Sequence, residues 1–152
     1  MNISSVSDSD LRVEWNRRFF LHPGDQLNAA KDAAEHLRTL FSQAARDQEH
    51  FAIILLNQQN RIIESRILFT GSLSTSAVYP REIVKLVLKH ESSSILVGHS
   101  HPSGAVKPSS SDKAVTVKIQ NALASIDSVL LDHLVLGNGT DGYFSFADNH
   151  LL

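Results

Sequence analysis

Two continuous apolar runs, residues 51–56 and 95–97, are the sequence feature that most limits how this chain can fold. Polar or turn-forming residues bound each run and each run is short, so each is predicted to be a buried strand. Residues 61–69, which are rich in isoleucine, follow the polar turn at residues 57–60 and predict the second strand of a hairpin. Strands buried in this way need helices packed against them, which indicates an α/β fold.

Three amphipathic segments supply candidate helices. Residues 25–46 carry apolar side chains three and four positions apart, the spacing that places them along one side of a helix. A second helix is predicted to begin at Pro80, because proline suits a first helical position. The third follows the loop marked by Pro102, Gly104 and Pro108. The remaining predicted strands are residues 72–79, 129–136 and 143–146.

Together these elements predict one α/β domain in which helices pack on a mixed β-sheet. A chain of 152 residues suits a single domain, which buries roughly 68–70% of the surface that its unfolded chain would expose. Residues 1–24 show little periodicity and are predicted to form a loosely held N-terminal arm. The domain is therefore assigned to residues 25–152.

The composition excludes several kinds of site. The chain has no cysteine, so disulfides, thiolate nucleophiles and zinc sites built on cysteine cannot occur. No run approaches the ~18 consecutive apolar residues of a membrane span, and the first residues lack the apolar core of a secretion signal. A cytoplasmic protein without membrane contact is therefore expected.

The charge of the chain bears on nucleic-acid binding. A formal net charge of −2 offers no large positive field for phosphates. The arm does contain a small basic spot, in which arginines alternate with aromatic residues that could stack on bases. Its members are Arg12, Trp15, Arg17, Arg18, Phe19 and Phe20. A solvated arm is the preferred interpretation, so nucleic acid is not favoured as a partner.

Three potential metal ligands follow the second apolar run. Side chains alternate along a strand, so His99 and His101 are expected on one face of the predicted sheet. Asp112 is predicted in the first turn of the third helix, which the short loop before it would fold back against the histidines. Two imidazoles and one carboxylate are ligands that zinc accepts, and three protein ligands leave a fourth position open for water, as in catalytic sites.

The same residues also have a structural interpretation. Ser109, followed by Asp112 three residues later and ahead of an apolar helical stripe, is a variant of the capping box that begins many helices. A single histidine at a strand end is usually a hydrogen-bonded polar group without further function. Two histidines beside a carboxylate favour a metal site, but the residues alone leave both interpretations open.

The pattern His-x-His, seven residues, Ser, two residues, Asp resembles the JAMM motif of MPN-domain metalloproteases. More narrowly, residues from about 30 to 152 resemble the bacterial RadC family. The similar segments are residues 80–83, residues 99–104 with Pro108 and Ser109, Asp132 with His133, and residues 143–146. Most members carry asparagine at the position of Ser100 and aspartate at the position of Ala105. We interpret Asp132 and His133 as a buried hydrogen-bonded pair.

This resemblance implies a fold and a cofactor. The fold is a cytidine-deaminase-like three-layer sandwich of the JAB/MPN type, with helices flanking a mixed sheet. The cofactor is one zinc ion per chain, with His99, His101 and Asp112 as its ligands. The implied activity is that of a zinc-dependent hydrolase, a metallopeptidase or isopeptidase that acts on a peptide or protein substrate.

The resemblance also assigns catalytic residues. Glu49, just ahead of the strand predicted at residues 51–56, matches the glutamate that acts as general base on the zinc-bound water, which then attacks an amide carbonyl. Glu64 is a weaker candidate for this base. Ser109 matches the serine whose hydroxyl supports the developing oxyanion.

Other functions were weighed against this one. The alternative is a binding module of DNA repair or recombination with a structural or vestigial metal site, suggested by the family's historical name. Neither the net charge nor the length of the chain favours it. A zinc nucleobase deaminase needs cysteine ligands, which this chain lacks. An iron site with two histidines and one carboxylate stays open as a minor alternative.

Overall fold

The computed structural model describes residues 3–71 and 78–152. The described residues form a five-stranded sheet in the order β2-β1-β3-β4-β5. β1 is antiparallel to β2 and β3, β3 is parallel to β4, and β4 is antiparallel to β5. The sheet is therefore mixed, as predicted. The strands are β1 (His50–Leu56), β2 (Ile62–Thr70), β3 (Ser94–His101), β4 (Val129–Gly137) and β5 (Tyr143–Ser145).

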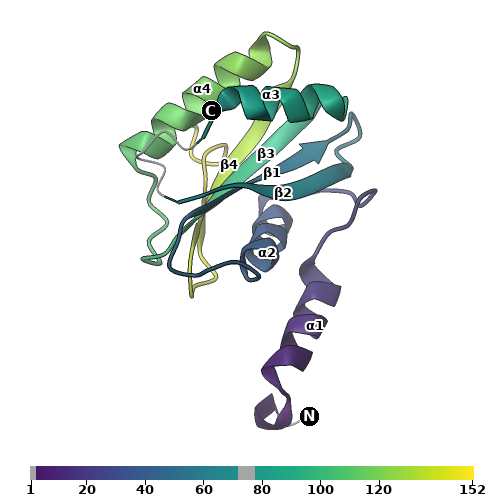
Figure 1. Cartoon of the computed structure of the whole chain (residues 1–152), viewed down its shortest axis with the longest axis vertical. Coiled ribbons are helices and arrows are strands. Elements are labelled where there is room, and N and C mark those ends of the chain that lie inside the picture. The colour runs from purple at the N-terminus through teal and green to yellow at the C-terminus, as the bar shows by residue number, and fades with distance from the viewer. Residues whose placement is uncertain (1–2, 72–77) are drawn as a thin grey trace.

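Helices cover both faces of this sheet. Figure 1 shows α3 (Pro80–Lys89) and α4 (Ser110–Ala124) on one face and α2 (Ala30–Phe41) on the other. This three-layer α/β arrangement confirms the predicted fold class and is consistent with a fold of the JAB/MPN type. Within the described ranges, no helix combines the length and the apolar character that crossing a membrane would require.

The burial of β1 explains why both faces of the sheet need helices packed against them. All seven of its residues are buried. Because side chains alternate along a strand, Ala52 and Ile54 pack into the core beneath α2, whereas Phe51 and Ile53 pack into the core beneath α3 and α4. The prediction of a strand buried on both faces is confirmed.

The first predicted helix is shorter than its apolar pattern suggests. The structure begins α2 at Ala30, not at residue 25. Before it, the backbone N–H of Leu27 donates to Asn60 O at 2.9 Å, and Gln26 forms an isolated bridge with Arg61. The segment is extended because its backbone groups pair with the β1–β2 turn, which periodicity cannot reveal. The strand predicted for residues 72–79 lies mostly outside the described residues.

The N-terminal arm contains a helix that the sequence pattern did not predict. α1 (Asp8–Phe19) projects away from the sheet (Figure 1), and none of its residues is buried. The Ser7 side chain caps its first turn, and a hydrogen bond of 2.9 Å from Trp15 Nε1 to Thr39 Oγ1 attaches it to α2. The signals for this helix are a cap and terminal charges that match the helix dipole, not an apolar stripe.

Candidate metal centre

The three predicted ligands converge where β3 ends and α4 begins. His99 Nε2 lies 3.1 Å from Asp112 Oδ1, and His101 Nε2 lies 3.3 Å from Asp112 Oδ2. The two histidine Nε2 atoms are 2.9 Å apart. Donor atoms about 2.0–2.2 Å from a tetrahedral zinc ion lie roughly 3.3–3.6 Å from one another. The observed spacing is thus close to what a single zinc ion needs.

Two glycines, one in the loop and one in β4, explain how the loop between these elements returns to the sheet. Gly104 has a φ of +84°, and its carbonyl oxygen packs against Gly137 of β4 so closely that a Cβ there would lie only 2.2 Å away. A side chain at either position would therefore displace the loop. The two glycines allow residues 102–108 to fold against β4 and deliver the start of α4 to His99 and His101.

The capping box at the start of α4 is present, and it also orients the carboxylate. Asp112 N donates to Ser109 Oγ at 3.0 Å, and Ser109 N donates to Asp112 Oδ2 at 2.7 Å. The structural interpretation of these two residues is therefore confirmed. It does not compete with the metal-site interpretation, because the same carboxylate faces both histidines.

The electrostatics of the cluster favour a cation. Burial alone would raise the pKa of Asp112, but the close contacts with the His101 and His99 rings, together with the hydrogen bond from Ser109 N–H, outweigh it and hold that pKa well below its usual range. The hydrogen bond with Asp112 raises the pKa of His101. An ionised carboxylate and two imidazole nitrogens facing one another form a set of acceptors that a positive charge satisfies.

One side of the cluster is open. His99 and Asp112 are buried, whereas the side chain of His101 is 13% exposed. The other ring nitrogen of His101, Nδ1, donates to Ala105 O at 2.8 Å, which leaves Nε2 free of a proton in the neutral ring. A ligand or substrate would therefore approach the cluster past His101.

Glu49 lies beside this opening. It is half-buried and directly precedes β1. β1 and β3 are antiparallel with Phe51 opposite His99, so continuing that register places Glu49 opposite His101 on the same face of the sheet. The charge of Glu49 contributes to the raised pKa of His101. Its place matches the one predicted for a general base.

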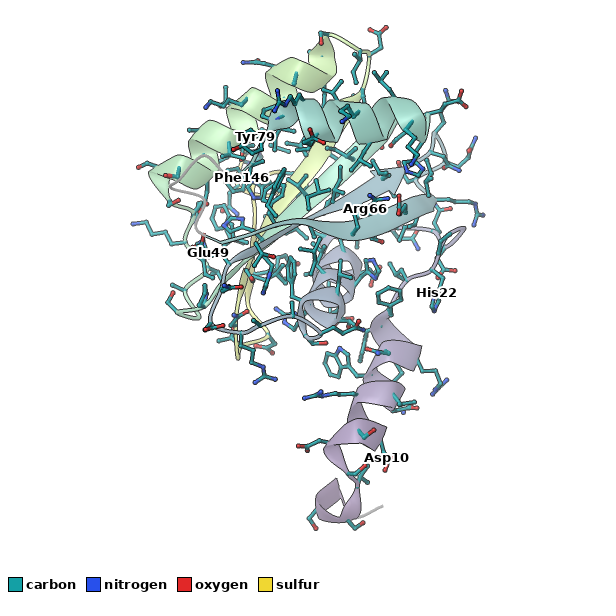
Figure 2. All side chains as sticks on the ribbon, viewed as in Figure 1. Asp10, His22, Glu49, Arg66, Tyr79 and Phe146 are labelled. Atoms are coloured by element: carbon teal, nitrogen blue, oxygen red, sulfur yellow. The ribbon has the colours of Figure 1, made fainter. Side chains whose placement is uncertain are left out.

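Glu64 lies elsewhere. It is opposite Leu55 in the β1–β2 ladder, four residues along β1 from Phe51, which corresponds to about 13 Å. Its carboxylate contacts Arg66 at 2.6 Å and His90 at 2.9 Å. Figure 2 shows Arg66 well separated from Glu49. The structure therefore does not place Glu64 at the candidate metal centre, and its role as an alternative base is wrong.

Two further residues contact the ligands and were not predicted to do so. His133 Nε2 lies 2.8 Å from His99 Nδ1, and His133 Nδ1 lies 2.6 Å from Thr116 Oγ1. The predicted hydrogen-bonded pair is only partly correct. Asp132 accepts from the backbone N–H of His133, but its carboxylate otherwise binds Ser145 Oγ at 2.6 Å and Ala147 N at 3.0 Å. Asp132 and His133 are adjacent in β4, so their side chains point to opposite faces of the sheet. Strand alternation alone could therefore have shown that the two side chains do not pair.

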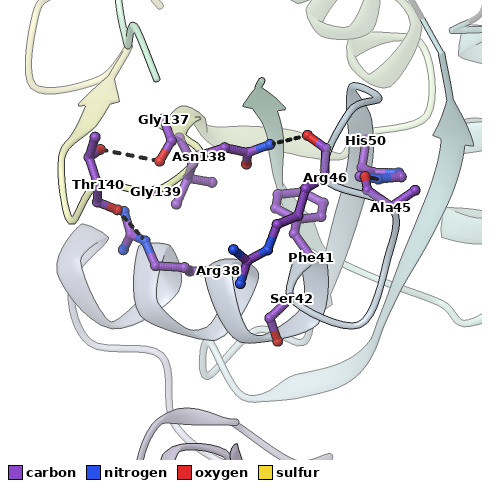
Figure 3. Close-up of a pocket in the computed structure, with 11 residues that line it drawn as sticks. Arg38, Phe41, Ser42, Ala45, Arg46, His50, Gly137, Asn138, Gly139 and Thr140 are labelled. Atoms are coloured by element: carbon purple, nitrogen blue, oxygen red, sulfur yellow. Dashed lines mark hydrogen bonds between the residues drawn. The ribbon is translucent and has the colours of Figure 1, made fainter. Parts of the chain in front are cut away.

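The structure also contains a cavity of about 210 Å³ that is not this centre. Figure 3 shows Arg38, Arg46 and His50 among its lining residues. Because His50 precedes Phe51 on β1, its side chain lies on the α2 face, opposite to His99. The sheet therefore separates the cavity from the candidate ligands.

Comparisons with known proteins provide a separate line of evidence. The model of a RadC-like JAB domain matches residues 27–151. Relatives described as UPF0758 proteins include one from Vibrio parahaemolyticus, 38% identical over 139 residues that cover 90% of this chain and 60% of the relative. Another, from Aeromonas hydrophila, is 41% identical over 128 residues, 84% of this chain and 55% of the relative. The chain thus spans little more than half the length of these relatives.

Proposed function

The chain belongs to the family of RadC-like JAB domains, and on this premise we propose that it is a zinc-dependent hydrolase of amide bonds, a metallopeptidase or isopeptidase. The observation that carries the proposal is the convergence of His99 Nε2, His101 Nε2 and an Asp112 carboxylate oxygen within 4.8 Å of one another. The donor set suits zinc, and one side of it is open to solvent at His101.

His99, His101 and Asp112 would hold the metal. When bound, zinc polarises a carbonyl oxygen and lowers the pKa of a coordinated water from 15.7 to about 7. The residues of the chain supply the rest of the chemistry. The pKa of the buried Asp112 carboxyl is held well below its usual range by its neighbours, so the group is available as a ligand in its ionised form. The ring of His101 is oriented by its hydrogen bond to Ala105 O.

Glu49 is the proposed general base. Its carboxylate lies on the face that carries the ligands, beside His101, where it takes a proton from the attacking water. The same carboxyl group then donates that proton to the amine that leaves as the amide bond breaks. A positioned acid–base group of this kind typically contributes about 10²–10⁴ in rate.

Ser109 is the proposed oxyanion donor. Its Oγ accepts from Asp112 N and so retains its own proton to donate. The residue is exposed at the start of α4, next to the ligand Asp112. A substrate carbonyl approaching past His101 would meet this hydroxyl as negative charge develops on its oxygen.

The DNA-repair alternative receives no comparable support. The net charge is −2. Two arginines of the basic spot, Arg17 and Arg18, form ion pairs with Glu14 at 2.7 Å and 2.5 Å. The positive charge expected to meet phosphates is therefore partly neutralised within α1 itself.

The test compares two glutamates in the zinc-loaded chain. Cleavage of a panel of peptides and lysine-linked isopeptides is measured alongside zinc content. We expect Glu49→Gln to retain about one zinc per chain and to lose about 10²–10⁴ in kcat/KM. Glu64→Gln, at the far end of the sheet, serves as the matched control and keeps the parental rate. Parental activity in Glu49→Gln would refute the mechanism.

A further inference from the structure

A line of buried hydrogen bonds leads from the candidate metal centre into the interior. It runs from His99 Nδ1 to His133 Nε2 at 2.8 Å, and from His133 Nδ1 to Thr116 Oγ1 at 2.6 Å. Thr116 Oγ1 then donates to Asp112 O at 2.7 Å. The three side chains in this line, His99, His133 and Thr116, each have 0% exposure, so water does not substitute for any member.

The donor and the acceptor of each hydrogen bond in this line can be assigned from the carbonyl oxygen of Asp112 at its end. A carbonyl oxygen only accepts, so the Thr116 hydroxyl donates its single proton to Asp112 O. The Thr116 oxygen must then accept from His133 Nδ1–H. A neutral imidazole has one N–H, so His133 Nε2 is an acceptor and His99 Nδ1 is the donor. His99 Nε2 is left with a lone pair that faces His101 and Asp112.

The surroundings of His133 keep its ring neutral and immobile. Its ring stacks on Phe146 at 4.6 Å between centroids and meets the edge of Phe51 at 5.9 Å. No carboxylate side chain hydrogen-bonds this ring among the described residues, so an imidazolium there would be buried without direct compensation. The aromatic contacts also oppose a ring flip that would exchange its two nitrogens.

The two ligand histidines differ in how their tautomers are set. His101 Nδ1 faces the carbonyl oxygen of Ala105, which accepts and fixes the proton on Nδ1 directly. His99 Nδ1 instead faces another imidazole, which can either donate or accept. Only the contact between His133 and Thr116 removes that ambiguity. Thr116, which does not touch the His99 ring, therefore decides which nitrogen of His99 carries the proton.

We propose that Thr116 and His133 are positioning residues that hold His99 in the tautomer whose Nε2 binds the metal, and that they set the metal affinity of the site. The inference rests on the proposed metal site. Partners that orient a ligand histidine typically change metal affinity by about 10–100-fold. A merely structural role for Thr116 would leave the tautomers of both histidines unchanged.

The experiment compares Thr116→Val with Thr116→Ser in the full chain. Valine keeps the volume but removes the hydroxyl, whereas serine keeps the hydroxyl. Zinc affinity is measured by competition with a chelator, and imidazole ¹⁵N shifts of the metal-free protein report the tautomers. We expect Thr116→Val to bind zinc about 10–100-fold more weakly and to show mixed tautomers at His133. Thr116→Ser should match the parent in both measurements.

His133→Phe provides a second variant that keeps the ring contacts with Phe51 and Phe146 but removes the acceptor for His99. The same loss of zinc affinity is expected. Parental zinc affinity in Thr116→Val would refute the proposed positioning role of Thr116 and His133. Weakened affinity with the His133 tautomer unchanged would refute it as well. If the parent chain binds no zinc, the proposed function fails, but the proton positions can still be tested in the metal-free parent. Protonation of His133 Nε2 would refute the proposed order of hydrogen bonds, and protonation of His133 Nδ1 would support it.

Discussion

His36 and His99 are both fully buried, yet their surroundings differ in one decisive respect. On the α2 face, His36 Nδ1 accepts from Leu21 N–H at 2.9 Å, and His36 Nε2 donates to Ser65 Oγ at 2.7 Å. Both ring nitrogens are thus satisfied by the protein. On the α4 face, His99 Nε2 points at further acceptors. Burial does not distinguish a candidate ligand from a structural histidine; the direction of its hydrogen bonds does.

Removal of a candidate ligand should give the largest difference between the two faces of the sheet. We expect His101→Ala to lower zinc affinity by more than the 10–100-fold typical of an orienting partner, because one of three donors is lost. His36→Gln should retain about one zinc per chain. Metal content after dialysis measures the difference.

Thermal unfolding with and without zinc provides the accompanying stability measurement. Zinc at 100 times its Kd should stabilise the parent and His36→Gln by about 2.7 kcal/mol. It should give His101→Ala no comparable stabilisation. Equal zinc content in His36→Gln and His101→Ala would show that the two histidines do not differ in the way proposed.

The dependence of the unfolding free energy on pH tests His36, the histidine whose two ring nitrogens are both satisfied by the protein. Burial lowers the pKa of His36 to about 4, whereas the unfolded chain binds this proton near pH 6.5. The unfolded state therefore holds more protons between these values, so the contribution of neutral His36 is complete above about pH 6.5 and is lost as the pH falls toward 4. The loss amounts to about 3 kcal/mol.

Urea unfolding of the metal-free parent and of His36→Gln, at pH 7 and at pH 4, measures this contribution. The difference in unfolding free energy between the two proteins should shrink by about 3 kcal/mol at the lower pH. A difference that stays constant across this range would mean that His36 is not held neutral by the fold.

The smallest expected effect on stability comes from Ser109, which contacts the Asp112 carboxylate and not the histidine rings. Ser109→Ala removes the hydroxyl that caps α4 and should lower the unfolding free energy by about 1 kcal/mol. Ser109 N–H still donates to Asp112, so zinc affinity should change little. If Ser109 also supports the oxyanion, kcat falls by about 10²–10³. Ser109→Thr keeps the hydroxyl and should retain both properties; a parental kcat in Ser109→Ala would reduce Ser109 to a helix cap.

Much of the fold and of the candidate ligand set could be predicted because most of the relevant signals are local. The apolar run at residues 51–56 becomes β1, and Pro80 begins α3. His99 and His101 share a face because strand side chains alternate. Asp112 meets them because Ser109 begins a helix three residues earlier and two glycines let the loop return. Apart from the packing of the loop against Gly137 of β4, each of these features depends on neighbours within a few residues.

Other features were decided only when distant segments came together. Residues 25–27 carry a helical pattern but pair with the β1–β2 turn instead. Glu64 is excluded from the centre, and Glu49 is placed beside it, by the register of β1 between two other strands. Strand register is a property of the pairing partner, so the composition of either strand alone does not specify it.

Local signals already specify which residues lie at the end of β3 and at the start of α4, because strand alternation and helix capping act over only a few residues. The surroundings of the His99 ring are completed by His133 and Thr116, which lie 34 and 17 positions further along the chain and reach it through packing. Hydrogen-bond direction depends on every member of a buried network, and such a network exists only once the sheet and α4 have packed together.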